Sequence, residues 1–497
     1  LRKLCYCLDL KLRNFYRPLP VAFMSFSKRR TLLTTAAFFL IGASAAPACA
    51  ESLQDAVISA LNTHPSVEAA IAARNAAIEA QEEQFAGYFP RLRASAATGR
   101  VYGDNSTSRG LSVTRGSGYS WNHEGSVTLT QMLFDGFRVE NRVDAARARR
   151  GAANKTIVDV REQLSLQAAL AYLSVLRAGE EKAVIEAFTE KIDDYVKRIE
   201  SMVNEGAANE AELQQARDMR IMLDTVRIES DGRLEVARAN YAEVVGNFPR
   251  GDLTLPIIDP VLIPEQDAAI HYALDHHPAL GVTLYRAEAA ENEIDVEKGA
   301  LYPELNAELS YLKRDLRDVI GGEVVDAKGL LRMNWNFSTG GEQLSKISRR
   351  KYEAEGQRAR VEEVRRQIEK DVRTAFAELE TSRLQNETYV RREILMSDLA
   401  GTNRTQFEGG IVSLLQLLQS ENQLFSAQLD RIGAKYRLLS ARFGALASLG
   451  KLQTSLNIVP ATHVTAKTTD QTNADFAGED ADAEPGFSVE NGETREN

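Results

Sequence analysis

Two periods of apolar residues divide the chain beyond residue 50. Long stretches place apolar residues three or four positions apart, which predicts amphipathic helices, and short stretches alternate apolar and polar residues, which predicts strands. The helical stretches from about Arg138 to Asn204 and from about Glu342 to Phe407 contain no proline. At about 1.5 Å per residue, each would reach on the order of 100 Å. We therefore expect long antiparallel helical hairpins.

Coiled-coil spacing accompanies the helical period. It is clearest in the last helical stretch, where apolar residues lie seven, or alternately four and three, positions apart. These residues are Leu418, Phe425, Leu429, Ile432, Tyr436, Leu439, Phe443 and Leu446. Such a stripe predicts that each hairpin packs against neighbouring helices.

Each predicted helical hairpin turns at glycine, which accepts the left-handed conformation that ends a helix. Asn or Ser, followed three positions later by Glu or Gln, is then typical of a new helix start. The first turn comprises Gly206, Asn209 and Glu212, and the second comprises Gly409, Gly410, Ser413 and Gln416. Two similar turns imply two similar hairpins.

Strand-like alternation appears in two places and predicts two strand hairpins. In the later one, apolar residues alternate with Arg332, Asn334 and Asn336. Those expected to face the membrane are Leu331, Met333, Trp335 and Phe337. Apolar-out and polar-in alternation is typical of membrane barrels. We expect polar loops over 102–118 and 313–328 to join the strands.

The two halves of the chain are copies of one unit. The start from Leu53 to Pro65 recurs at Asp267 to Pro278 with constant spacing, which indicates a duplication. Before the repeats we expect upstream translation over 1–23 and a signal peptide over 24–50. The first repeat would cover 51–250, with a strand hairpin near 91–134 and a helical hairpin over 138–246. After a linker over 251–266, the second repeat would cover 267–459, with a strand hairpin near 303–337 and a helical hairpin over 342–450, and a disordered acidic tail would follow over 460–497.

The predicted signal peptide starts at Met24, has a basic segment and an apolar run, and ends in Ala48-Cys49-Ala50. Cleavage before Glu51 would leave a chain without cysteine. An alternative is a lipid-anchored Cys49, although the residues before it match a lipoprotein signal poorly.

The whole chain carries a formal net charge of -10, and loss of the basic leader would make it more acidic. This disfavours a nucleic-acid partner. No catalytic, phosphate-binding or metal-ligand motif is found, so we expect no enzyme activity, cofactor or metal. We interpret His64-Pro65 and His277-Pro278 as helix boundaries.

Four strands cannot close a barrel, and an open sheet edge in lipid leaves backbone groups unpaired. Closure would need further copies of the chain, so we expect a cyclic oligomer. Two other hypotheses remain open, a periplasmic coiled-coil scaffold and a secreted surface protein, and neither requires strand hairpins.

In these features the sequence resembles the TolC family of outer-membrane channels. The resemblance runs from about Glu51 to Pro460. It rests on the duplicated start, the F-P and Y-P steps before the strands (Phe89-Pro90, Tyr302-Pro303), the strand ends at Phe134 and Phe337, and the two glycine turns.

The resemblance implies a mainly α-helical protein with a β-barrel portion, in which long coiled-coil hairpins carry four membrane strands per chain. It implies a homotrimer with a twelve-stranded barrel in outer-membrane lipid and a helical tunnel in the periplasm. A periplasmic adaptor would join it to an inner-membrane pump, for which we expect an ABC exporter. We favour type I protein secretion, with drug or small-molecule efflux as the alternative.

The resemblance also assigns roles to the two turns. Gly206, Asn209, Glu212, Gly409, Gly410 and Ser413 would form the tips that contact the adaptor. Gln416 and Gln419 stand where the family commonly carries lumen-facing acids at the tunnel constriction. Two glutamines predict that no fixed ring of charge closes this tunnel, unless Glu212 or Glu421 supplies it.

Overall fold

The computed structural model describes residues 51–104, 117–206, 209–256, 264–316, 323–337 and 339–458. All of them belong to one compact unit. The expected upstream segment, signal peptide and acidic tail lie outside the described residues, as does Cys49. Residues 257–263 of the expected linker also lie outside them.

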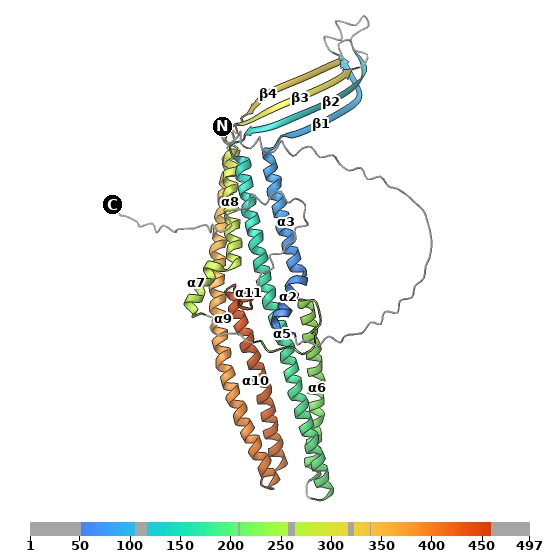
Figure 1. Ribbon diagram of the computed structural model, residues 1–497, viewed down its shortest axis with the longest axis vertical. Helices are drawn as coiled ribbons and strands as arrows, with labels where there is room; N and C mark the ends of the chain where they lie inside the picture. Colours follow the sequence, from blue (N-terminus) through green and yellow to red (C-terminus); the bar gives the residue numbers. More distant parts are fainter. Residues whose placement is uncertain are drawn as a thin grey trace, which may run out of the picture. The chain divides into compact units, whose positions relative to one another are not determined.

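Long helices and four strands make up the described chain (Figure 1). In chain order they are α2 (Leu53–Thr63), α3 (Pro65–Phe85), η2 (Ala86–Tyr88), β1 (Arg91–Asp104), β2 (Ser117–Phe134), α5 (Arg138–Asn204), α6 (Glu210–Val245), α7 (Gln266–His276), α8 (Pro278–Gly299), β3 (Glu304–Leu316), β4 (Glu323–Asn334), α9 (Glu342–Glu408), α10 (Leu414–Ser448) and α11 (Leu452–Ser455).

The two halves match element by element. Helices α5 and α9 each contain 67 residues, and α6 and α10 contain 36 and 35. Helices α2 and α7 each contain 11 residues. The bounds of α5 agree with the sequence prediction, and α9 is one residue longer than expected.

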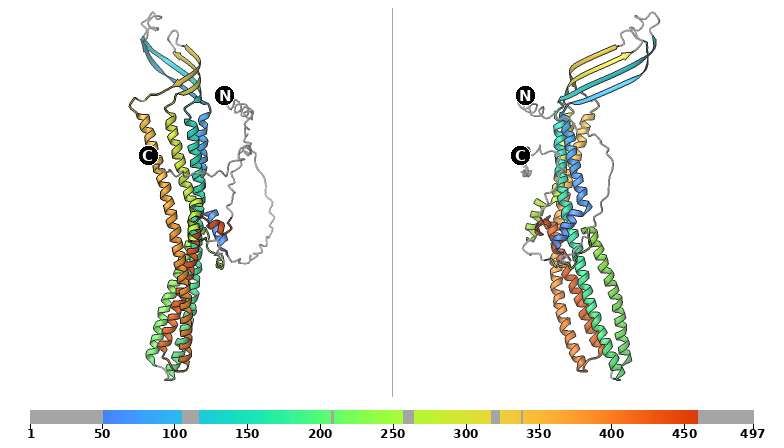
Figure 2. Two further views of the ribbon diagram at one scale, coloured as in Figure 1. Left: turned by 90° about the vertical axis from the view of Figure 1, so that its left-hand side faces the viewer. Right: turned by 45° about the vertical axis from the view of Figure 1, so that its right-hand side comes forward.

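The helical hairpins α5–α6 and α9–α10 run side by side (Figure 2), and α10 also contacts α5. Above the hairpins, α3 packs against α5, and α8 packs against both α5 and α9. The heptad residues of α10 from Ile432 onward are buried with α2 and α5 in one apolar cluster. The two repeats of the chain are thus packed together by the heptad residues that the sequence indicates.

The four strands form one antiparallel sheet in the order β1-β2-β3-β4. Each strand pairs with the next in sequence, so β1 and β4 are edge strands of the single chain. The strands are longer than expected, because residues 102–104, 117–118, 313–316 and 323–328 continue the ladder where the sequence predicts loop, and residues 119–124 extend β2 before its expected start. The sequence pattern misses these residues because they are polar, although their backbone groups still pair.

The described helices contain no segment that is long and apolar enough to cross a membrane.

Candidate functional site

The two helix turns adopt the predicted backbone conformation at one glycine each. Gly206 has φ 74° and Gly410 has φ 72°, both in the left-handed region. Gly409 differs, because it ends α9 with φ -81° in the ordinary right-handed region. Of the glycine pair, only Gly410 therefore uses the freedom that glycine gives.

Polar caps start the helix after each turn. Ser413 Oγ accepts a hydrogen bond from the backbone N–H of Gln416 at 3.4 Å, as predicted. Asn209 Oδ1 accepts instead from Ala211 N–H at 3.1 Å, and Glu212 donates its own N–H to the Asn209 carbonyl. Asn209 is thus the predicted cap, but its side chain binds the second helical residue and not Glu212.

Apolar packing brings the two hairpins together above the turns. Ile185, Phe188 and Ile192 of α5 belong to one buried cluster with Leu213 of α6 and Leu417 of α10. The rings of Phe188 and Phe425 stack with centroids 4.3 Å apart. Both turns therefore lie at the same end of the molecule, at the ends of α5 and α9 opposite to the strands.

A buried carboxylate crosses this interface. The side chain of Glu421 on α10 is 0% exposed. Lys191 Nζ donates to it at 3.1 Å, the Tyr195 hydroxyl at 3.0 Å and Arg404 Nη2 at 2.5 Å. Lys191 and Tyr195 lie on α5 and Arg404 lies on α9, so Glu421 ties three helices together.

Burial alone would raise the pKa of Glu421, but hydrogen bonds from Arg404 and Lys191 outweigh it and hold the pKa below its usual value. The carboxylate is therefore charged and internally neutralised. Sequence reasoning misses this role and treats Glu421 as a source of charge near the constriction, which is wrong because the side chain is buried. The available signal is an acid four residues after Leu417 and three before Leu424, on the apolar face of the helix.

Gln416 and Gln419 lie on the exposed side of the first turns of α10. Asn422 and Gln423 continue the same exposed side one turn further. This surface carries amides and no ionisable group, whereas the buried face next to it carries the Glu421 cluster. The structure thus brings the predicted constriction residues together on one uncharged stripe.

The sheet has one apolar and one polar face at its helix-proximal end. Leu331 pairs with Ala307 and Met333 with Leu305, so these four side chains share one face. Leu331 and Met333 are 67% and 63% exposed in the single chain, as expected of lipid-facing residues. On the opposite face, Arg332 forms an ion pair with Glu308 at 2.8 Å.

Trp335 and Phe337 lie beyond the end of β4, so their prediction as strand residues is wrong. Trp335 Nε1 donates to the Leu301 carbonyl at 3.0 Å, which ties it to the segment before β3 and ends the ladder. The two rings contact each other, with centroids 4.6 Å apart. Both rings are exposed where the strands meet the helices, a position typical of the aromatic residues that border a membrane.

The apolar face ends on its other side at charged residues. Lys313 pairs with Val325 in the ladder and forms an ion pair with Glu323 at 3.3 Å. Trp121 on β2 stacks on His123 near this end. An apolar band bordered by aromatic and charged residues is typical of a membrane strand.

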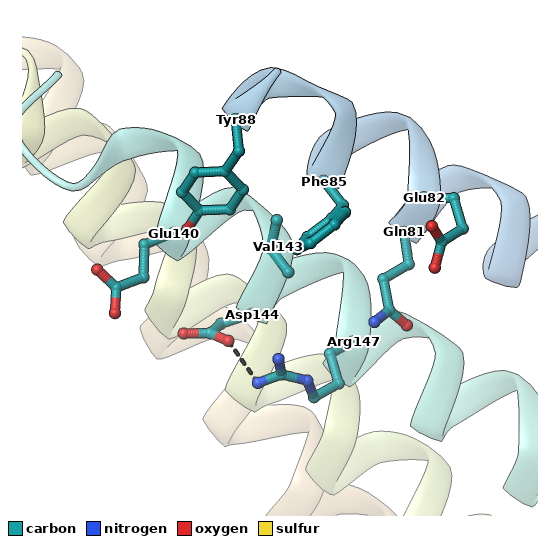
Figure 3. A pocket seen from close by; sticks show the side chains of 8 residues that line it. All are labelled: Gln81, Glu82, Phe85, Tyr88, Glu140, Val143, Asp144 and Arg147. Atoms are coloured by element: carbon teal, nitrogen blue, oxygen red, sulfur yellow. Dashed lines mark hydrogen bonds and ion pairs between the residues drawn. The ribbon is translucent and has the colours of Figure 1, made fainter. Parts of the chain in front are cut away.

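A groove between α3 and α5 lies close to the strands (Figure 3). Phe85, Tyr88 and Val143 form its apolar part, and Asp144 pairs with Arg147 at 2.6 Å. The pair is exposed and local to one helix, so the groove gives no indication of a catalytic or ligand site.

The two histidine-proline steps act as helix caps. His64 Nδ1 accepts from Ser66 N–H and His277 Nδ1 accepts from Ala279 N–H, both at 3.2 Å. Burial lowers the pKa of His277. Within the described residues, no group of three or more His, Cys, Asp or Glu side chains is placed to hold a metal.

Comparison with known proteins identifies the family. Residues 57–219 and 269–451, more than half of the chain, match the outer membrane efflux protein family. The chain is 24% identical over 412 residues to the outer membrane efflux protein BepC of Brucella suis biovar 1 (strain 1330), covering 82% of this chain and 86% of BepC.

Solved structures have the same fold. A membrane protein from Pseudomonas aeruginosa matches with a TM-score of 0.70 and 18% identity, over 80% of this chain and 93% of that one. The Campylobacter jejuni CmeC outer membrane channel matches with a TM-score of 0.69 and 15% identity, over 82% and 90%. This chain therefore belongs to the outer membrane efflux protein family, and it is an outer-membrane channel with membrane strands and a helical extension into the periplasm.

Proposed function

We propose that three copies of this chain form one export duct, with a shared barrel of twelve strands. The observation that carries this is the open four-stranded sheet with one apolar face. Its edges, β1 and β4, have no partner strand among the described residues, and an unpaired edge in lipid costs several kcal/mol per exposed group. Pairing of β1 with β4 of a neighbouring copy satisfies both edges.

Native mass spectrometry of the detergent-purified protein tests this assembly. Three chains per particle and heat-modifiable migration in gels are the expected results. A stable monomer in the outer-membrane fraction contradicts the shared barrel, and release of the protein from washed cells favours a surface or scaffold protein instead.

The tips around Gly206 and Gly410 are proposed to contact a periplasmic adaptor, which links the duct to an inner-membrane pump. An added Cβ at Gly410 meets nothing within 4 Å, and Ile411 beside it is 75% exposed, so this surface is open to a partner. Gly410→Trp is expected to abolish export while trimers still form.

Gly410→Ala is the matched control, because it brings the same positive-φ strain without the bulk of the indole. Export should survive in this variant. Unchanged export in Gly410→Trp, or equal loss in both variants, counts against adaptor contact at this turn.

For cargo, we propose small-molecule efflux. It is supported by the names of the matched family and of BepC, both of which are called outer membrane efflux proteins. Type I secretion of polypeptides, which the sequence favours through its resemblance to TolC, stays a second candidate. The duct itself supplies passage and no catalytic chemistry.

Deletion of the gene, with measurement of drug susceptibility and of the secreted proteins, separates the two cargo classes. Increased susceptibility with an unchanged secretome supports efflux. Loss of one secreted polypeptide, together with co-purification of an ABC exporter, supports type I secretion.

A further inference from the structure

Three arginines surround a cavity of about 230 Å³ where the strands meet the helices. Arg91 begins β1, and Arg138 and Arg142 lie in the first two turns of α5. Within the described part of the chain, none of the three forms an ion pair, and Arg138 Nε is buried without a hydrogen-bond partner. A buried guanidinium nitrogen without a partner is costly unless a ligand satisfies it.

The acids at this cavity are already engaged. Asp135 accepts the backbone N–H groups of Arg138 and Val139 at 3.1 and 2.8 Å, so its charge caps the start of α5. Glu304 accepts a hydrogen bond from the Asn306 side-chain amide at 2.8 Å. Among the residues that line the cavity, three guanidinium groups face these two occupied carboxylates, so the lining carries a net positive charge.

Electrostatics agree with this geometry. Burial lowers the pKa of Arg142, and the positive charges of Arg138 and Arg91 lower it further, against opposing contributions from Asp135 and Glu297. The three arginines are therefore close enough to repel one another. A bound oxyanion would relieve that repulsion and accept the planar, paired hydrogen bonds that guanidinium groups donate.

The strand pairing shows on which face of the sheet the cavity lies. Arg91 pairs with Thr130, and Met132 pairs with Asn306, so all four side chains lie on one face. Asn306 also pairs with Arg332, which places the cavity on the polar face opposite to Leu331 and Met333. In a membrane barrel the polar face lines the lumen.

The edge strand of a neighbouring copy would add no carboxylate beside the cluster. If β4 of the next copy pairs with β1, the residues that β4 brings to the base of this face are Asn334 and Arg332, which add no acid. We propose that Arg91, Arg138 and Arg142 form an oxyanion-binding site on the lumen wall, which receives the phosphate, sulfate or carboxylate group of an anionic solute in transit. This inference rests on the proposed barrel.

The test is single-channel recording of the purified trimer in a bilayer of zwitterionic lipid, which excludes anionic headgroups as ligands. Sodium pyrophosphate is the probe, at low ionic strength where charge is little screened. The wild-type channel should prefer anions in a KCl gradient and be blocked by pyrophosphate. Arg91→Gln and Arg142→Gln should each raise the half-blocking concentration about tenfold, since a charged hydrogen bond is worth at least that much.

Arg93→Gln is the matched control. Arg93 lies two residues along β1 on the same face but does not line the cavity. The pyrophosphate concentration that half-blocks the Arg93→Gln channel should differ from the wild-type value by less than about twofold. A binding site depends on direct contacts, and the loss of a charge outside it acts only through the screened field. Arg142→Lys, which keeps the charge but loses the guanidinium fork, should fall between wild type and Arg142→Gln.

Pyrophosphate without effect on the wild-type channel, or equal effects of Arg93→Gln and Arg91→Gln, overturns the site. A wild-type trimer that conducts nothing contradicts the duct itself and is a separate failure. If Arg142→Gln does not assemble, Arg91→Gln decides, because Arg91 is exposed and its replacement leaves the core intact.

Discussion

At the scale of single residues, the chain places one charge where its apolar pattern calls for a hydrophobic side chain. Glu421 lies on the buried face of α10 between Leu417 and Leu424 and is balanced by Lys191 and Arg404. Burying such a group adds little net stability, but removing its charge leaves the partners uncompensated. Its position between α5, α9 and α10 gives the two hairpins a defined relative register.

We predict that Glu421→Gln destabilises the turn end of the helices. Loss of the carboxylate charge leaves Lys191 and Arg404 without a counter-ion, at a cost of about 2 kcal/mol, since both basic side chains are partly exposed to solvent. Hydrogen exchange around residues 185–205 and 404–421 should accelerate, with a lower unfolding temperature. Asp194→Asn, which breaks an exposed pair with Lys197, is the control and should cost less than about 1 kcal/mol.

The difference in free energy of unfolding between wild type and Glu421→Gln should shrink as the pH falls. The folded-state pKa of Glu421 lies below the ordinary value of 4.5, so its contribution is complete above 4.5 and is lost as the pH falls through the folded-state value. Urea unfolding at neutral pH and at progressively lower pH should show the two proteins converging. A gap that widens with acid would contradict the assignment.

Gly410 supports a second prediction at this scale. Ala at φ 72° is strained, so Gly410→Ala should destabilise the turn by about 1 kcal/mol. Gly409→Ala, at φ -81°, should be neutral or slightly stabilising, since ordinary residues accept that conformation. Thermal unfolding of the two variants compares them directly, and equal effects would refute the difference between the glycines.

At the scale of elements, neighbouring residues of one strand face different surroundings, because they lie on opposite faces of the sheet. Leu330 and Leu331 are consecutive leucines, yet Leu331 shares a face with Met333 and Leu330 pairs with Glu308. Since successive side chains point to opposite faces, the same substitution at the two positions samples lipid and lumen separately.

Leu331→Arg is therefore expected to destabilise the membrane-inserted protein by about 1–3 kcal/mol, the cost of a basic side chain on the lipid face between the bilayer midplane and the interface. Leu330→Arg should be tolerated, because it lies beside Glu308 on the polar face. Urea unfolding of the inserted protein, together with the yield of heat-modifiable trimer, measures both. The reverse order of the two variants would place lipid on the other face.

At the scale of the whole molecule, the constriction and the strand base have different electrostatic character. The exposed side of α10 near the turn carries amide side chains, of which Gln416 and Gln419 lie nearest the turn. The cavity at the strand base carries arginines. A solute moving from the turns toward the strands would thus meet a neutral surface before a positive one.

We predict that multivalent cations block the wild-type channel only weakly, because Gln416 and Gln419 supply no negative charge at the proposed constriction. Gln416→Asp combined with Gln419→Asp would place two carboxylates per chain there and should create strong block by a trivalent cation in single-channel recordings. Gln416→Asn with Gln419→Asn controls for side-chain length. Strong block of the wild type that disappears in Gln416→Ala would refute the prediction.

The sequence by itself determines the helices, the turns and the duplication. These depend on local signals: heptads, a glycine at each turn, caps at Asn209 and Ser413, and the alternation around Leu331. Such signals act within a few residues of one another, so a single chain reveals them. Matching them in order was also sufficient to indicate the family.

Only the tertiary structure decides what distant residues do together. Glu421 is paired with residues of α5 and α9, Arg91 meets Arg138 and Arg142 at one cavity, and Trp335 leaves the strand to bind the Leu301 carbonyl. Each depends on the packing of elements far apart in the sequence, where burial and charge are set by neighbours that no local period records. The strand ends were misjudged for a related reason, since backbone pairing continues through polar residues whose pattern resembles a loop.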